Sequence, residues 1–306
     1  MPDPVVASRM IWVRIVRYWL VVLSGITCIK LGISLRFASF PLLPSISWKS
    51  KPLPEKSLGC DQELVKSVDV VVSLYNFLKY KPVLEKSVKS CFANPKVTFH
   101  FILVAGSRDE VEWLTELVAD SHHKLHLVDR RIGIYAAWNI GIESGTGDYI
   151  TNLNTDDLRL PHSICCQAAS LQQASAEGSF GNFILSKDIL ADLYSKSTKW
   201  LVSNLGKFDI RKLVIGSQNF MHCAPMWKRE LHTANGLFNE ELRSSGDTEF
   251  WLRCMASGAS FVSYSPETVV YFHNPEGLST SVGSVGHKEW TRIRDSFLKV
   301  RQTRVR

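Results

Sequence analysis

Short apolar runs alternate with amphipathic stretches over much of this chain, and the alternation predicts its secondary structure. Runs rich in β-branched and aromatic residues predict strands at 68–75, 99–105, 124–128 and 148–153. Apolar positions at helical spacing predict helices at 80–93, 107–119, 134–144 and 161–174. Strands that alternate with helices indicate an α/β fold, in which helices cover both faces of a mostly parallel, Rossmann-like sheet.

Two of the expected helices carry start signals. Ser107 and Glu110 have the spacing of a capping box, in which each side chain satisfies a backbone N–H group of the first turn. Pro161 suits the first turn of the last helix, where its missing N–H group removes no hydrogen bond. Both signals support the predicted helix boundaries.

The two ends of the 306-residue chain do not share this pattern. Residues 1–40 are apolar with spaced cations, and their longest uncharged run, 18–29, is shorter than the ~20 residues of a transmembrane helix. An amphipathic helix or hairpin at a membrane interface, a single span with snorkelling cations, and a helix packed on the domain all fit this pattern. The proline-rich stretch 41–64 predicts an extended linker, which leaves a folded domain at 65–285 and a basic helix or tail at 286–306.

The net charge of +7 is concentrated at the two ends of the chain. Residues 1–56 carry +6 and residues 288–306 carry +5, whereas residues 57–287 carry −4. A nucleic-acid-binding protein is expected to place its positive charge on the binding domain, so this distribution argues against nucleic acid as a partner. Basic ends fit either an anionic membrane surface or solvated tails.

Cysteine usage indicates the compartment. The seven cysteines are odd in number and lack a C-x-x-C spacing, which disfavours both a disulfide framework and a zinc site. This usage favours a reducing compartment. We therefore expect a cytoplasmic protein that is peripherally attached to the cytoplasmic face of a membrane, with a single span as the alternative.

The most informative segment, 133–158, runs from a helix through a glycine turn into a strand that ends in Asn154-Thr155-Asp156-Asp157. Two adjacent carboxylates at the carboxyl end of a buried strand are costly unless a positive charge faces them. Ligands bind at this edge of open α/β sheets, and a divalent cation carrying a diphosphate would satisfy both carboxylates. A solvated turn that caps the following helix is the alternative interpretation.

This segment resembles the nucleotide-sugar glycosyltransferases of family 2, whose fold is called GT-A. The family pattern G-x-x-x-A-x-N-x-G-I, then G-D/E-Y-I, then L-D/N-x-D-D, is matched in order. The matching residues are Gly133, Ala137, Asn139, Gly141-Ile142, Gly147-Asp148-Tyr149-Ile150 and Leu153-Asn154-Thr155-Asp156-Asp157. The similarity extends from about residue 68 to about residue 281, so it implies a GT-A domain with a small acceptor-side subregion.

The resemblance implies a Mn²⁺ or Mg²⁺ ion that neutralises the leaving diphosphate. Asp157 would bind the metal and Asp156 the metal or the ribose, with Asn154 standing where relatives carry another acidic residue. A late histidine often completes the metal shell in GT-A folds, which indicates His273, and a polar loop histidine is the alternative.

Residues 246–253, GDTEFWLR, resemble the family element E-D-x-x-x-W-L-R, whose Asp is the general base. Asp247 would take the proton of the acceptor hydroxyl, and an N-cap of the following helix is the alternative role. The family's Glu is Gly246 here, so Glu249 is the residue that would share or assume the role of base. Trp227, in a stretch that precedes this element in relatives, either covers a sugar ring or packs in the core.

The part of the family pattern that binds the nucleotide matches this chain less closely. The candidate donor-binding residues in this part are Ser73, Tyr75, Asn76, Asp109 and Arg131. Val104 and Ala105 replace the carboxylates that usually read the base, and Asp109 is the candidate to replace them. Arg131, or its neighbour Arg130, would reach a phosphate unless the pair is only a solvated surface feature.

These motifs lead us to expect a glycosyltransferase that moves a sugar, with inversion, from a nucleotide-diphosphate donor to a hydroxyl on a glycan or lipid-linked acceptor. Members of this family commonly act in the synthesis of surface polysaccharides or glycolipids, so the resemblance implies such a role. A nucleotidyltransferase is less consistent, because no glycine-rich loop follows the first strand. A degenerate, non-catalytic binder is the other alternative, since Val104, Ala105 and Gly246 each replace a usual carboxylate.

Overall fold

The structure, a computed structural model, describes most of the chain from residue 66 onward and one short strand before it. The described ranges are 47–51, 66–89, 91–160, 163–187, 200–209, 212–213, 221, 223–273 and 284–304. The membrane-seeking segment expected at 1–40 lies outside these residues, as do Pro161 and most of the expected linker. In the part of the chain that the structure describes, no helix combines the length and apolar character needed to cross a bilayer.

The first half of the domain is a parallel sheet, as the sequence predicts. β2 (Val68–Leu74) is central, with β3 (Val97–Val104) and β5 (Tyr149–Asn152) on either side and β4 (Lys124–Val128) beyond β3. All of these neighbouring strands pair in parallel. Their carboxyl ends therefore share one edge, and this edge carries the predicted donor-binding motifs.

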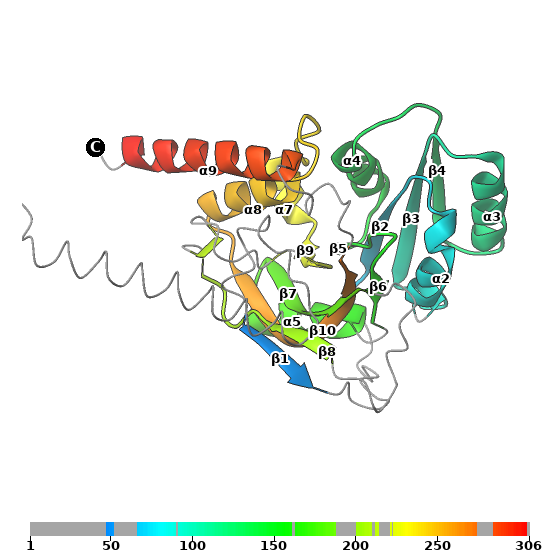
Figure 1. The fold of residues 1–306 in the computed structure, drawn as a ribbon, viewed down its shortest axis with the longest axis horizontal. Coiled ribbons are helices and arrows are strands. Elements are labelled where there is room, and N and C mark those ends of the chain that lie inside the picture. Colours follow the sequence, from blue (N-terminus) through cyan, green and yellow to red (C-terminus); the bar gives the residue numbers. More distant parts are fainter. Residues whose placement is uncertain are drawn as a thin grey trace, which may run out of the picture.

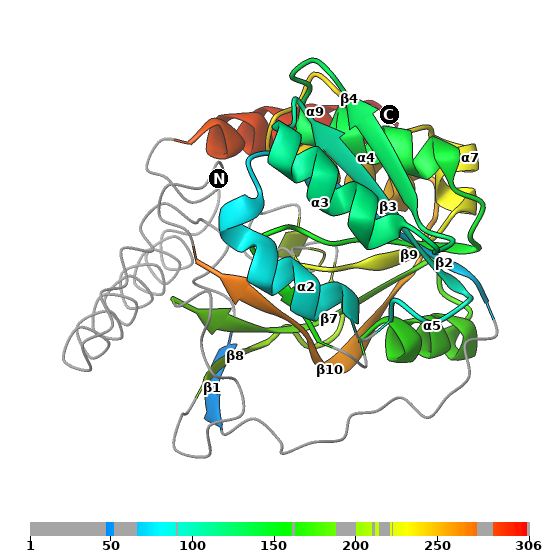
Figure 2. The ribbon, with the colours of Figure 1, turned by 90° about the vertical axis from the view of Figure 1, so that its right-hand side faces the viewer.

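Helices cover both faces of this sheet (Figure 1). α4 (Ile134–Ser144) packs on one face, whereas α2 (Lys81–Lys89), α3 (Arg108–Val118) and α5 (Ser163–Ala174) pack on the other. The turned view of Figure 2 places α3 in front of β3. Gly141 lets α4 approach the sheet closely, because a Cβ atom there would lie 2.9 Å from a side chain of β2.

The second half of the chain makes the whole sheet a mixed one. β9 (Met226–Lys228) lies between β5 and β7 (Gly178–Ser186), antiparallel to both, and β7 pairs in parallel with β10 (Phe261–Phe272). β8 (Trp200–Asn204) pairs with β7, and β1 (Ser47–Lys51), within the expected linker, pairs antiparallel with β8. The position of β9 brings the chain that precedes it next to the end of β5.

The remaining elements extend the layer that contains α4. α8 (Gly246–Ala256) shares the apolar core of α4, and α9 (Val285–Arg304), in the region expected to be a basic helix or tail, lies along α8 (Figure 1). α7 (Glu230–Asn235) follows β9 and packs against α8. The short β6 (Leu158–Arg159) pairs antiparallel with β10 just after the Asp156-Asp157 turn.

The predicted boundaries are accurate in the first half of the domain. The strand at 124–128 and the helix at 134–144 have the bounds expected from the sequence, and Ser107 forms the predicted capping box with Glu110. The helix expected at 80–93 differs. A 3₁₀ turn, η3 (Leu78–Tyr80), leads into α2, which ends at Lys89 ahead of a turn and the Asn94-Pro95 pair. Proline disfavours helical backbone at the residue before it, so Pro95 keeps Asn94 out of the helix.

Candidate active site

Strained turns surround the carboxyl edge of the parallel strands. Asn76 after β2, Ala105 after β3 and Ala224 before β9 have positive φ angles of 48°, 47° and 46°. A non-glycine residue in this left-handed region costs about 1–3 kcal/mol, and such residues concentrate at functional sites. These three turns lie at the edge that the sequence motifs indicate, whereas Asp120 and Ser175, which also have positive φ angles, precede β4 and β7 at the opposite edge.

Asp156 and Asp157 lie in the turn between β5 and β6, at that edge. Asp157 is buried, and its Oδ1 accepts a hydrogen bond from the Phe272 N–H group (3.2 Å) while its Oδ2 accepts one from Asn154 Nδ2 (2.9 Å). Burial raises the pKa of both carboxyls, and the charge of Asp156 raises the pKa of Asp157 further. Lys79 opposes the rise in the pKa of Asp156. The pair therefore holds more negative charge than its surroundings compensate.

The donor atoms at this turn fit a hard divalent cation. Two carboxylates with uncompensated charge match the way Mg²⁺ binds, through one or two carboxylates and the phosphates of a substrate. His273, the predicted third ligand, follows Phe272, and its backbone N–H group donates to the Ser186 carbonyl at 2.9 Å. In the described part of the chain, no three His, Cys, Asp or Glu side chains come together as a ready-made cluster, so the predicted three-residue set is not assembled there.

Asp247 lies in the first turn of α8, and Ser245 is the N-cap residue of that helix. Its Oδ1 accepts hydrogen bonds from the Thr248 N–H group (2.7 Å) and from the Tyr135 hydroxyl (3.3 Å). Burial raises the pKa of Asp247 to about 6, and these two donors oppose the rise. A carboxylate with this pKa is mostly ionised at pH 7 and accepts a proton readily, which suits a general base better than a helix cap.

Cys223 connects the two groups of carboxylates. It is buried, 3% exposed, in the chain that leads into β9. Burial raises the pKa of its thiol well above the ordinary value, and the charges of Asp157, Asp156 and Asp247 raise that pKa further. Cys223 packs in the same apolar cluster as Tyr135, whose hydroxyl contacts Asp247. It lies just before Met226, which pairs with Thr151 near the end of β5. The fold thus joins two motifs that are far apart in the sequence into one site.

Glu249, the alternative base, is engaged in an ion pair. Its two carboxylate oxygens accept hydrogen bonds from Arg253 Nε (2.9 Å) and Nη2 (2.8 Å). Arg253 also donates to the Asn235 and Leu237 carbonyls at the end of α7. This arrangement ties Glu249 to the contact between α7 and α8, so the structure favours Asp247 as the base.

The predicted nucleotide-binding residues gather at the ends of β2, β3 and β4. Arg131 Nη1 donates to the Tyr75 hydroxyl at 2.9 Å, and the guanidinium lies 4.4 Å from the centre of the Tyr75 ring. Both side chains are exposed, as are those of Asn76 and Asp109, whereas Ser73 is half-buried near the end of β2. These residues leave an aromatic face and a cation at the surface of the site.

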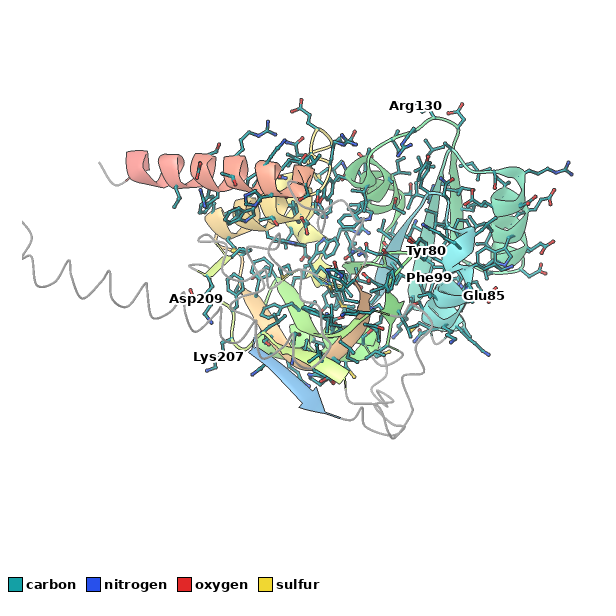
Figure 3. The ribbon with its side chains drawn as sticks, viewed as in Figure 1. Tyr80, Glu85, Phe99, Arg130, Lys207 and Asp209 are labelled. Atoms are coloured by element: carbon teal, nitrogen blue, oxygen red, sulfur yellow. The ribbon has the colours of Figure 1, made fainter. Side chains whose placement is uncertain are left out.

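Three residues that shape the site carry no family signal in the sequence. Glu110 is buried, and its Oε1 accepts a hydrogen bond from the Phe77 N–H group at 2.7 Å, which ties the start of α3 to the turn after β2. In the sequence, only its capping-box spacing from Ser107 indicated a structural role for Glu110. Tyr135 and Cys223 become site residues only when α4, α8 and β9 meet. Arg130, the predicted alternative to Arg131, lies in the exposed loop after β4 (Figure 3).

Trp227 belongs to the core. It is 1% exposed, and its indole Nε1 donates to His232 Nε2 at 2.9 Å. Burial lowers the pKa of His232 to about 4, so this imidazole is neutral near pH 7 and accepts that hydrogen bond. Of the two roles considered for Trp227, the structure therefore supports core packing beneath the site.

Comparison with known proteins agrees with this geometry. The profile of glycosyl transferase family 2 matches residues 69–232, more than half of the chain. A "PGL/p-HBAD biosynthesis glycosyltransferase" from Mycobacterium bovis is 26% identical over 191 residues, which cover 60% of this chain and 69% of the relative.

Two solved structures show the same fold. TarS 1–349 from S. aureus, in complex with UDP-GlcNAc, gives a TM-score of 0.57 at 12% identity, covering 71% of this chain and 61% of the TarS chain. The mannosyltransferase PcManGT from Pyrobaculum calidifontis, in complex with GDP-Man and Mn²⁺, gives a TM-score of 0.51 at 16% identity, covering 76% of this chain and 61% of its own. The chain thus spans less than two thirds of either solved chain. With its GT-A fold and its matching profile, this chain belongs to glycosyl transferase family 2.

Proposed function

We propose that this enzyme transfers a sugar from a nucleoside-diphosphate donor to a hydroxyl acceptor and inverts the anomeric centre. The proposal is carried by the convergence of Asp156, Asp157 and Asp247, which the pairing of β9 with β5 and the contact of Tyr135 with α8 bring together. This convergence sets a pair of carboxylates suited to a cation beside a carboxylate with the pKa of a general base.

Binding of the donor would depend on Asp157 and Asp156, which would hold Mn²⁺ or Mg²⁺. When bound, the ion neutralises charge on the departing diphosphate. The hydrogen bond from Asn154 fixes the orientation of Asp157, and the exposed Tyr75–Arg131 pair offers a ring face for a base or a charge for a phosphate. The complexes of TarS with UDP-GlcNAc and of PcManGT with GDP-Man and Mn²⁺ support a nucleotide-sugar donor and a divalent ion.

The chemical step would be a single displacement. The acceptor oxygen attacks the anomeric carbon while the bond from that carbon to the diphosphate oxygen breaks. Asp247 takes the hydroxyl proton, and the electron pair of the broken bond leaves with the nucleoside diphosphate. Because attack and departure occur on opposite sides of the carbon, one such step inverts its configuration.

The acceptor we propose is a glycan or a lipid-linked sugar. The relative named for PGL/p-HBAD biosynthesis supports this class of acceptor. Residues 1–40, basic and apolar, would hold the enzyme peripherally at the cytoplasmic face of an anionic membrane, where such acceptors lie. Flotation with anionic vesicles tests the attachment: equal flotation of the full chain and of a chain without residues 1–40 would contradict it.

Calorimetric titration tests the donor site. UDP, GDP, CDP and dTDP are each titrated into the full chain with and without Mn²⁺ or Mg²⁺. We expect one nucleotide to bind only with metal, and Asp157→Asn to remove that binding. Asp295→Asn, on the exposed face of α9, is the matched control and should bind normally. Binding of no nucleotide by the native chain would refute the donor site, and binding without turnover would support the non-catalytic alternative.

A further inference from the structure

Gly246 and Tyr135 pack directly against each other beside the proposed base. A Cβ atom built on Gly246 would lie 2.7 Å from both Cδ2 and Cε2 of Tyr135 and 2.9 Å from its Cζ. These distances are far below van der Waals contact, so the phenol ring occupies the space that any side chain at position 246 would need. The family element that residues 246–253 resemble has the Glu of its E-D pair at this position.

The Tyr135 ring has little freedom to move aside. It is buried, 3% exposed, and its ring centre lies 5.4 Å from that of Trp138 and 5.8 Å from that of Phe238. Residues from α4 and from the segment before α8 thus enclose it on two sides. A ring held in this way fixes where its hydroxyl group points.

That hydroxyl group points at the base. The Tyr135 hydroxyl donates to Asp247 Oδ1 at 3.3 Å, and the Thr248 N–H group donates to the same oxygen at 2.7 Å. Burial and the charge of Asp247 raise the pKa of Tyr135 well above its ordinary value, so the hydroxyl keeps its proton near pH 7. Tyr135 is therefore a neutral donor beside the base.

We propose that Tyr135 is a positioning residue for Asp247, standing in for the first acidic residue of the family's E-D pair. The ring fills the space opposite Gly246, and the hydroxyl orients the Asp247 carboxylate and stabilises its ionised form. The inference rests on the proposed function, because it requires Asp247 to be the base.

The groups that face Asp247 determine what a pH profile would report. Tyr135 faces it from α4, and the charge of Asp247 also acts on the buried Cys223 thiol in the chain before β9. Elevated pKa values keep both groups neutral near pH 7. The acidic limb of the kcat profile should then follow Asp247 with an apparent pKa of about 6.

Tyr135→Phe tests the proposal, because it removes one oxygen and keeps the ring. We expect kcat to fall about tenfold, as for loss of one hydrogen bond to a charged group, with KM for the donor unchanged. We also expect the acidic limb to move to higher pH, because the hydroxyl normally lowers the pKa of Asp247. Tyr149→Phe is the control, since Tyr149 is equally buried but lies at the amino end of β5.

A second pair of variants keeps the proposal testable if Tyr135→Phe folds poorly. Gly246→Ala should crowd the enclosed ring and disturb the contact between its hydroxyl and Asp247, so it should reproduce the loss of kcat and the shifted limb, whereas the same change in a Tyr135→Ala background, where the ring is absent, should add little. Additive effects would overturn the proposal, as would native kcat and pH profile in Tyr135→Phe. If Asp247→Asn itself kept native turnover, the proposed function would fail instead, so the two failures are distinguishable.

Discussion

Glu289 of α9 offers a sharp test of how the site is held together, because one carboxylate supports the chain that leads into the base. Its Oε1 accepts a hydrogen bond from the Arg243 N–H group (2.8 Å), and its Oε2 accepts bonds from the N–H groups of Ser244 (2.9 Å) and Ser245 (3.0 Å). The Ser245 hydroxyl also donates to the Gly286 carbonyl at 2.9 Å. Gly246 and Asp247 follow directly, so α9 fixes the start of α8.

The expected cost of removing this carboxylate can be worked from these contacts. Each hydrogen bond to a charged acceptor contributes about 1.5–3 kcal/mol, and the three are not additive. Arg243 is exposed, so its N–H group can form a hydrogen bond with water instead. Ser245 is buried, so its N–H group would be left without a partner. We expect Glu289→Ala to lower the free energy of unfolding by about 3 kcal/mol and Glu289→Gln by about half of that, because the amide keeps one acceptor oxygen.

The assay is urea unfolding of the full chain, combined with kcat measured well below the midpoint. Glu289→Ala should lower kcat more than it raises KM for the donor, because the segment that leads into Asp247 loosens while the donor site is unchanged. Glu116→Ala, on the exposed face of α3, is the control for loss of a surface glutamate. A Glu289→Ala protein with native stability and native kcat would refute the reasoning.

Three further predictions follow from individual contacts. Glu249→Gln should keep most of its turnover where Asp247→Asn loses it, since Glu249 is paired with Arg253; loss of turnover in a stable Glu249→Gln protein would make Glu249 the base. Arg131→Ala should weaken nucleotide binding about tenfold by calorimetry, whereas Arg108→Ala, on α3, should leave it unchanged; equal affinities would remove Arg131 from the donor site. His123 and His232 should destabilise the fold as pH drops from about 6.5 to about 4, because burial lowers the pKa of each to about 4, so the unfolded chain binds more protons at these two sites. The raised pKa values of Asp156, Asp157 and Asp247 act in the opposite direction, so the test compares variants: each histidine contributes up to about 3 kcal/mol, and a His123→Gln protein whose urea midpoint has the same pH dependence as that of the native chain would contradict the prediction.

The sequence predicts the parallel half of the fold well because that half is built from local signals. β2, β3, β4 and β5 are short apolar runs, and Ser107 forms its capping box with a residue only three positions away. The second half has no comparable signal: β9 is three residues long, and it joins the sheet because β5 and β7 leave a place between them. Pairings of this kind depend on tertiary context rather than on local pattern.

The same difference applies to the site. Asp156, Asp157 and Asp247 carry recognisable motifs, so the sequence alone indicated them. Tyr135 and Glu289 carry none, because each gains its role from a segment far along the chain: Tyr135 from α8 and Glu289 from the loop before α8. Glu249 is paired with Arg253 one turn away, at an i,i+4 spacing that can be read from the sequence but that the family motif does not address.

The three missing family carboxylates argue for a rebuilt site more than for an eroded one. Val104 is buried among apolar residues beneath α4, where a carboxylate would have to be desolvated without a partner. Ala105 holds a left-handed turn, and its N–H group donates to the Val128 carbonyl at 2.7 Å, so the backbone there is ordered. At Gly246 the Tyr135 ring fills the vacated space and supplies a hydrogen bond to Asp247. Each of the three positions is therefore filled or bonded, which favours the proposed catalytic site over the non-catalytic alternative.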